Sequence, residues 1–147
     1  SNRADPTTAL PLASWQMDTA YEDQQIVPGT VYYYWVKVAT DGVGENASDL
    51  GSVNSGYRAL LPPSAVQATT GRLGEIEVSW GPTEGAGFFR IYRGTAPSSS
   101  RARVLSDWQV DTRFVDRTTV PGTTYYYWIK GSPRDNGFNA SAFGAAA

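Results

Sequence analysis

One stretch of the sequence occurs twice, and this repeat constrains the fold more than any other feature. VPGTVYYYWVK at residues 27–37 recurs as VPGTTYYYWIK at residues 120–130, an offset of 93 residues. The alignment runs without a gap between residues 1–54 and 94–147, and 21 of the 54 pairs are identical. Solenoid units are only about 20–45 residues long. The period therefore favours a series of separate sandwich-like domains.

The composition excludes several kinds of function. The chain has 147 residues, a net charge of −2, and neither histidine nor cysteine. These absences remove the usual zinc ligands, thiol nucleophiles and histidine-based triads. There is no basic excess that would suggest nucleic acid, and no apolar run long enough for membrane insertion. We expect a protein that is not an enzyme and has no cofactor and no metal.

Alternating polar and apolar residues predict β-strands throughout the second half. Residues 75–80 alternate so that Ile76, Val78 and Trp80 share one face. The FFRIYR stretch at 88–93 alternates in the same way. A Pro-Gly turn precedes a long strand predicted over 123–131, and a last strand is predicted to start near Ala140. The pattern indicates an all-β chain.

The order of three motifs resembles the fibronectin type III domain. EVSW at 77–80 is followed by RIYR at 90–93 and PGTTYYYWIK at 121–130. The resemblance implies an immunoglobulin-like β-sandwich with Trp80 in its core. It also implies a tyrosine corner at Tyr125, and at Tyr32 in the first copy, whose hydroxyl bonds to the backbone of the turn. The YYYW run and Gly56-Tyr57-Arg58 are similar to tandem repeats of bacterial extracellular surface proteins, which implies an extracellular or cell-surface location.

The repeat also predicts the domain organisation. Residues 62–147, which begin with a stiff Pro-Pro junction, are expected to form a near-complete domain. Residues 1–61 are expected to form a C-terminal partial copy that lacks strands A–C. The inner face of that copy, formed by Tyr32, Tyr34 and Val36, would then be exposed core. We favour a window from a long tandem array. The alternatives are a protomer completed by a neighbouring chain and, less favoured, an ill-chosen or proteolysed fragment.

The aromatic residues on the other face of the repeated strand are candidate interface residues: Tyr33, Trp35, Tyr126 and Trp128. Exposed aromatic rings on a sheet can contact another protein or stack on a carbohydrate. Alternatively, long side chains such as Arg90 or Lys130 cover these rings. Trp15 and Trp108 hold matched positions, and we expect both to pack at the core or its edge.

Several polar residues admit both a chemical and a structural interpretation. Carboxylates lie just before each Pro-Gly-Thr turn, at Glu22-Asp23 and at Asp116. Their repeated position favours a role in capping the turn over a role in acid–base catalysis. The carboxylates of Asp41, Glu45 and Asp49 could form a calcium site. We favour a solvated loop, because the second copy lacks all three residues. Asn46 and Asn139 each begin an Asn-Ala-Ser triplet and are possible glycosylation sites, or they bond to their own backbone.

These observations predict a non-catalytic structural or assembly segment of an extracellular tandem-repeat surface protein or filament. Its expected partners are other copies of itself or neighbouring repeats of a longer chain. The alternative is a binding module, either a segment of an adhesin or an accessory domain of a secreted polysaccharide-degrading enzyme. Carbohydrate is a possible partner in that case.

Overall fold

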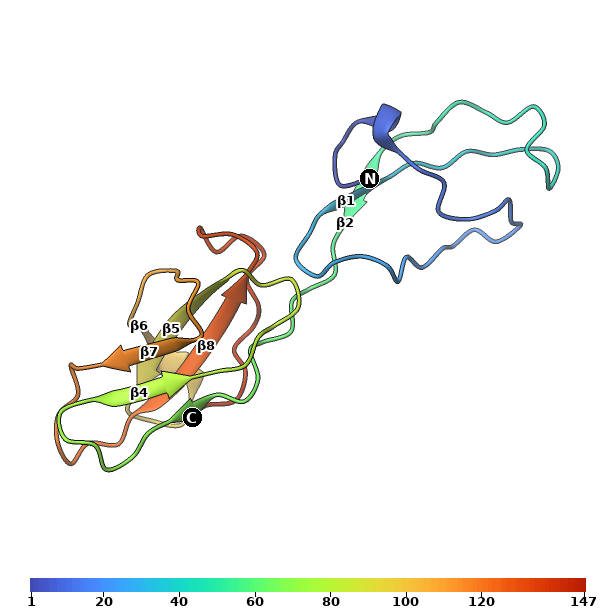
Figure 1. Cartoon of the computed structure of the whole chain (residues 1–147). Coiled ribbons are helices and arrows are strands. Elements are labelled where there is room, and N and C mark those ends of the chain that lie inside the picture. The colour runs from blue at the N-terminus through green and yellow to red at the C-terminus, as the bar shows by residue number, and fades with distance from the viewer. The chain divides into compact units, whose positions relative to one another are not determined.

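The computed structural model describes all 147 residues and divides into two compact units, Ser1–Arg58 and Ala59–Ala147. All the strands pair antiparallel, and the helical residues form two short 3-10 turns, η1 (Pro6–Thr8) and η2 (Ser99–Arg101) (Figure 1). The predicted all-β fold class is therefore confirmed. The structure contains no helix with the length and hydrophobicity of a membrane span.

The second unit, Ala59–Ala147, is built from two three-stranded sheets. One has the order β3-β4-β7 and the other the order β6-β5-β8. The strands are β3 (Gln67–Ala68), β4 (Ile76–Ser79), β5 (Phe88–Gly94), β6 (Arg103–Val104), β7 (Arg113–Asp116) and β8 (Tyr126–Ser132). The longest pairing joins β5 to β8, from Phe88 opposite Ser132 to Gly94 opposite Tyr126. This arrangement agrees with the strands that the alternating residues predict and with the sandwich that the resemblance implies.

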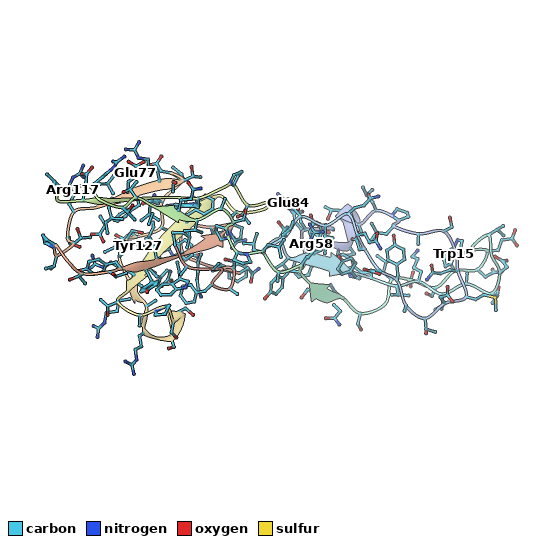
Figure 2. All side chains as sticks on the ribbon, turned by 90° about the horizontal axis from the view of Figure 1, so that it is seen from below. Trp15, Arg58, Glu77, Glu84, Arg117 and Tyr127 are labelled. Carbon is cyan, nitrogen blue, oxygen red and sulfur yellow. The ribbon has the colours of Figure 1, made fainter.

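The core of the second unit lies between these sheets. Its buried cluster consists of Val78, Trp80, Phe89, Ile91, Tyr127 and Ile129. Four of the six lie before Gly94, where the repeated region begins. They come from β4, from the residue after it and from β5. In Figure 2 the side chain of Tyr127 lies within the unit, whereas Glu77 and Arg117 lie at its periphery. Segment 61–93 therefore supplies most of the side chains that cover β8.

The last predicted strand, near Ala140, is not a regular strand. The Ser141 N–H donates to the Gly131 carbonyl at 2.8 Å, and Ala147 and Tyr127 exchange two bonds of 3.1 Å. In the return direction of the Ser141–Gly131 pair, the Gly131 N–H donates to the Ser141 hydroxyl instead of a carbonyl. The side chain thus takes a place in the ladder, and residues 141–147 follow β8 without forming a continuous strand.

The first unit, Ser1–Arg58, has a single two-stranded sheet. Strand β1 (Tyr32–Tyr34) pairs antiparallel with β2 (Asn54–Gly56), with Tyr34 opposite Asn54. On the other side of β1 the Tyr33 N–H donates to the Ser1 carbonyl at 2.7 Å, and the Ser1 amino group donates to the Tyr33 carbonyl at 3.3 Å. Ser1 is thus the only residue that hydrogen-bonds to that edge of β1.

Candidate functional site

A buried carboxylate joins three parts of the second unit. Asp116, at the end of β7, is 1% exposed. One of its oxygens accepts from Arg93 at 2.6 Å and from the Tyr127 hydroxyl at 2.9 Å. The other accepts from the Thr118 N–H at 2.9 Å and the Thr118 hydroxyl at 2.7 Å. The Asp116–Arg93–Tyr127 triad therefore links β7, β5 and β8 across the two sheets.

The contacts of the triad set the protonation states of its members. Burial by itself would raise the pKa of Asp116, but the hydrogen bonds from Thr118, Arg93 and Tyr127 outweigh it, and the pKa lies below the ordinary carboxyl value. Burial, together with the neighbouring carboxylate, raises the pKa of Tyr127. At neutral pH the triad is thus an anion that accepts from a cation and a neutral phenol.

The tyrosine corner is present in both units. The Val120 N–H donates to the Tyr125 hydroxyl at 3.2 Å, and the Val27 N–H donates to the Tyr32 hydroxyl at 3.3 Å. In the second unit the Arg93 guanidinium also lies over the Tyr125 ring, 4.6 Å from its centroid. Arg93 therefore connects the triad to the turn that precedes β8.

The first unit repeats this network without the arginine. The Tyr34 hydroxyl donates to Asp23 at 3.2 Å, and the Gln25 N–H donates to the other Asp23 oxygen at 3.0 Å. These positions match Tyr127, Asp116 and Thr118 at the offset of 93 residues. Desolvation, and then the charge and hydrogen bond of Asp23, raise the pKa of Tyr34. The carboxylate of Asp23 contacts no cation.

The matched strands differ most in what covers them. Ile129, on the inner face of β8, is 1% exposed, and its counterpart Val36 is 72% exposed. Tyr32 and Tyr34, the other residues of the predicted exposed core, are half-buried. The first unit has no counterparts of the β4 and β5 side chains that cover Ile129. Val36 therefore lies on an apolar face that is not covered. We call it the open face, and it consists of Tyr32, Tyr34, Val36 and Val38.

The four aromatic candidate interface residues are not equivalent. Trp128 is buried at 3%, so it is not available as an interface residue, and the alternative that such a ring is covered holds for it. Its ring lies against Gly94 on the paired strand and 6.4 Å from the Tyr126 ring. Tyr126, Tyr33 and Trp35 are half-buried. Arg90 and Lys130, expected to cover these rings, lie instead over Trp108 and Phe143, at 5.9 and 4.4 Å from the ring centroids.

The matched tryptophans pack on matched glycines. Trp108 lies against Gly137 and Trp15 against Gly44, and both glycines have positive φ, +78° and +81°. The next matched pair, Asn46 and Asn139, has the same left-handed φ of 53°. Ser141, which completes the second Asn-Ala-Ser triplet, is buried, and its hydroxyl donates to the Ala142 carbonyl. In the second unit the triplet thus forms the turn into residues 141–147.

The remaining carboxylates act within loops. The side chain of Asp41 accepts from the N–H groups of Val43, Gly44 and Glu45, at distances of 2.8–3.1 Å. Glu45 and Asp49 add no oxygen to this turn, and the structure contains no cluster of three or more His, Cys, Asp or Glu side chains. Asp41 therefore caps a turn.

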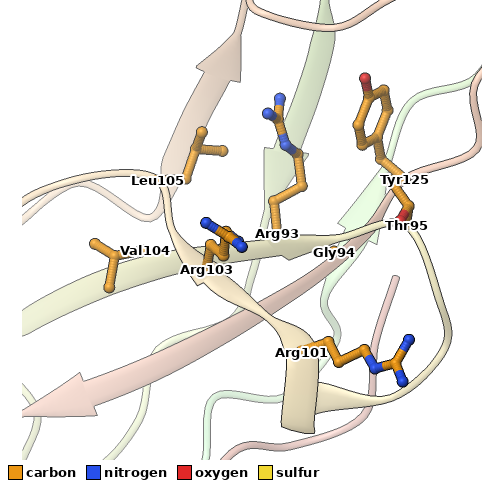
Figure 3. Close-up of a pocket in the computed structure, with 8 residues that line it drawn as sticks. All are labelled: Arg93, Gly94, Thr95, Arg101, Arg103, Val104, Leu105 and Tyr125. Carbon is orange, nitrogen blue, oxygen red and sulfur yellow. The ribbon is translucent and has the colours of Figure 1, made fainter.

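An arginine-lined pocket opens where β5 turns into β6. Its volume is about 190 Å3, and it is lined by Arg93, Gly94, Thr95, Arg101, Arg103, Val104, Leu105 and Tyr125. The three guanidinium groups do not converge on one point (Figure 3). That of Arg93 donates to Asp116 instead. The pocket has positive charge but no arrangement of donors that would hold an anion from several sides.

The comparisons identify the fold. No sequence profile of a protein family matches the chain, and no curated protein is similar to it in sequence. The chain is similar in structure to an Fn3-like protein from Clostridium thermocellum, with a TM-score of 0.54 and 21% identity over 60% of this chain and 90% of that one. It is also similar to a two-domain fibronectin type III segment from chicken tenascin, with a TM-score of 0.62 and 18% identity. That match covers 81% of this chain and 63% of the tenascin segment. The chain has the fibronectin type III fold.

Arg93 is the important residue that the sequence analysis missed. A signal for it was present, since Asp23 and Tyr34 recur as Asp116 and Tyr127 with the same spacing. A buried carboxylate needs a cation or several donors. RIYR ends in an arginine just before the repeat resumes, so Arg93 was a candidate for that cation.

Proposed function

We propose that this chain is a non-catalytic structural segment of an extracellular tandem-repeat protein or filament, and that neighbouring repeats complete and connect its sandwiches. The observation that carries the proposal is the contrast between Val36 and Ile129, which hold matched positions but are 72% and 1% exposed. A strand whose sequence suits a sandwich core has an open face in the first unit. Such a face is suited to hold another polypeptide.

Physical considerations support a protein as the occupant. Burial of apolar surface contributes about 25 cal/mol per Å2, so covering an apolar sheet face favours association. Contiguous apolar patches of this kind mark interaction sites in soluble proteins. Both units use the same tyrosine corner and the same Asp–Tyr hydrogen bond. A repeat that carries the β4 and β5 core side chains of the second unit would therefore suit the open face.

The proposal predicts association through the open face. Sedimentation velocity of the chain over a wide concentration range is expected to show concentration-dependent assembly. Val36→Asp should reduce this assembly strongly, because a carboxylate on the open face opposes burial. Val110→Asp is the matched control, since Val110 is also exposed but lies in the second unit. A chain that stays monomeric at every concentration, or equal effects of the two variants, would contradict an assembly role.

A second candidate function, carbohydrate binding, rests on the aromatic residues of β1 and the residue after it. Tyr33 and Trp35 keep part of their rings exposed, whereas Trp128 does not. Aromatic faces of this kind can stack on sugars. A binding module should change its tryptophan fluorescence on titration with soluble polysaccharides. Trp35→Ala should then abolish the change and Trp128→Phe should leave it.

A further inference from the structure

The loop that follows β8 contains the only Asn-Gly pair of the chain, Asn136-Gly137. The side chain of Asn136 is exposed. Because glycine has no Cβ, its backbone nitrogen can approach the side-chain carbonyl carbon of the preceding asparagine with little hindrance. That nitrogen can then displace the amide nitrogen of the side chain and close a cyclic imide. Asn136 is therefore open to a reaction with its own backbone.

The turn formed by residues 134–137 both assists and opposes this reaction. The Phe138 N–H donates to the side-chain oxygen of Asn136 at 3.0 Å. Negative charge develops on that oxygen when the nitrogen attacks, and a donor already in place stabilises it. In opposition, the Gly137 N–H donates to the Arg134 carbonyl at 3.2 Å and must leave this bond before its nitrogen can attack. One long hydrogen bond in an exposed loop opens readily, so we expect reaction during brief openings of the turn.

No other position of the chain combines these features. The remaining asparagines precede alanine, serine or arginine, whose Cβ atoms hinder the attacking nitrogen. In the matched turn of the first unit, Val43 stands at the position of Asn136. The one Asp-Gly pair, Asp41-Gly42, carries a carboxylate, which is a poorer electrophile than an amide. The reaction is thus expected in the second unit alone.

The same loop has little room for a longer main chain. The buried hydroxyl of Ser132 lies 2.7 Å from the Arg134 carbonyl and 3.0 Å from the Phe138 carbonyl, and so holds both ends of the loop. Between these ends Gly137 lies against Trp108, and even an added Cβ would be 2.7 Å from the ring. Because the contact is already close, we expect an extra backbone atom just before the glycine to displace the indole.

We propose that Asn136-Gly137 is a site of spontaneous deamidation, and that its isoaspartyl product releases Trp108 from the loop. The Gly137 nitrogen loses its proton and bonds to the side-chain carbonyl carbon of Asn136, while the amide nitrogen takes up a proton and leaves as ammonia. Water then opens the imide at either carbonyl. Opening at the side-chain carbonyl leaves an ordinary aspartate. Opening at the main-chain carbonyl leaves isoaspartate, in which the main chain runs through the Cβ and is one atom longer. Neither step depends on the proposed function.

The first experiment measures deamidation in the intact chain. The chain is incubated in warm, mildly alkaline buffer, and its tryptic peptides are sequenced by mass spectrometry. The peptide of residues 135–147 contains both Asn136 and Asn139, so the two sites are compared in one sample. We expect Asn136 to react at least about tenfold faster, with isoaspartate among the products, because Asn139 precedes an alanine. Equal rates at the two sites, or no reaction at Asn136, would overturn the inference.

The second experiment follows the indole of Trp108. The indole N–H signals of the tryptophans are recorded in a proton–nitrogen correlation spectrum, and the signal lost in Trp108→Phe is assigned to this residue. A partly converted sample should show a second signal for Trp108 and none for Trp15, which packs on Gly44 in the matched turn. A single Trp108 signal in a sample that contains isoaspartate would show that the indole stays in place, and the second half of the proposal would be wrong.

Two variants separate the isoaspartyl product from other effects of incubation. Asn136→Gln would have to form a larger and less favourable ring, so it should show neither deamidation at this site nor a second Trp108 signal. Freshly prepared Asn136→Asp has the charge of the ordinary product without the longer main chain, and its Trp108 signal should keep the parent position. A second signal in incubated Asn136→Gln, or the same displaced signal in Asn136→Asp, would mean that the longer main chain is not what releases the indole.

Discussion

At the residue scale, the carboxylate of Asp116 accepts more hydrogen bonds than any other side chain. It accepts four hydrogen bonds, one of them from the partly exposed Arg93. Asp116→Asn should cost about 2–3 kcal/mol, because the buried amide lacks the charge that pairs with Arg93 and is a weaker acceptor for Tyr127. The free energy of unfolding from urea titration of the full chain measures the loss.

Asp23→Asn is the matched control for this substitution. Asp23 is half-buried and accepts only from Tyr34 and Gln25. Its loss should therefore change the stability by less than about 1 kcal/mol. Equal costs for the two substitutions would mean that Arg93 contributes little to the triad.

The pKa of Asp116 predicts how stability depends on pH. Its folded value lies below the ordinary 3.8, so the unfolded chain binds its proton first as the pH falls. The contribution of Asp116 is thus complete above that ordinary value and is lost as the pH falls through the lower folded pKa. Urea midpoints measured from about pH 6 to about pH 2 should fall more steeply for the parent chain than for Asp116→Asn. Parallel curves would contradict the shift.

The glycine beneath Trp108 makes a second prediction at this scale. A Cβ at Gly137 would lie 2.7 Å from the Trp108 ring, and the residue has a φ of +78°. Gly122 has nearly the same φ, +77°, but nothing lies within 4 Å of its Cβ position. Gly137→Ala should therefore cost about 1–3 kcal/mol more than Gly122→Ala, because only the first displaces the indole. Near-ultraviolet circular dichroism checks that displacement, and an unchanged spectrum would exclude it.

At the element scale, one repeated strand sequence has two environments. Tyr127 and Ile129 are buried in β8, whereas Tyr34 is half-buried in β1 and Val36, just beyond β1, is exposed. Ile129→Ala should cost about 2–5 kcal/mol, because it leaves a cavity in the core. Val36→Ala should change the stability of the unassembled chain by less than about 0.5 kcal/mol. Thermal unfolding at low protein concentration compares the two, and a large cost at Val36 would show that the open face is covered within the chain.

The same strand shows what a sequence can predict. Alternation correctly places Val78, Trp80 and Ile129 on faces that meet in the core, because side chains along a strand point alternately to its two sides. It could not show that Trp128 is buried as well, since its ring lies against Gly94 of the paired strand β5, a contact that is distant in sequence. Nor could it reveal the bonds between Ser1 and Tyr33, because strand register depends on contacts distant in sequence.

At the scale of the whole molecule, the two units differ in how much each can stabilise itself. The eight buried hydrophobic side chains all belong to the second unit. Two strands without a covered apolar face are at best marginally stable in water. The chain should therefore unfold in two separable steps, the first confined to residues 1–58.

Hydrogen exchange of the full chain at low concentration distinguishes these steps. Amides of β5 and β8 should exchange only through global unfolding of the second unit, because both strands are paired on two sides and enclose the core. Amides of β1 and β2 should exchange far faster, and their protection should rise with protein concentration if assembly covers the open face. Protection of β1 equal to that of β8 at every concentration would mean that the first unit is stable alone. The open face would then require no partner.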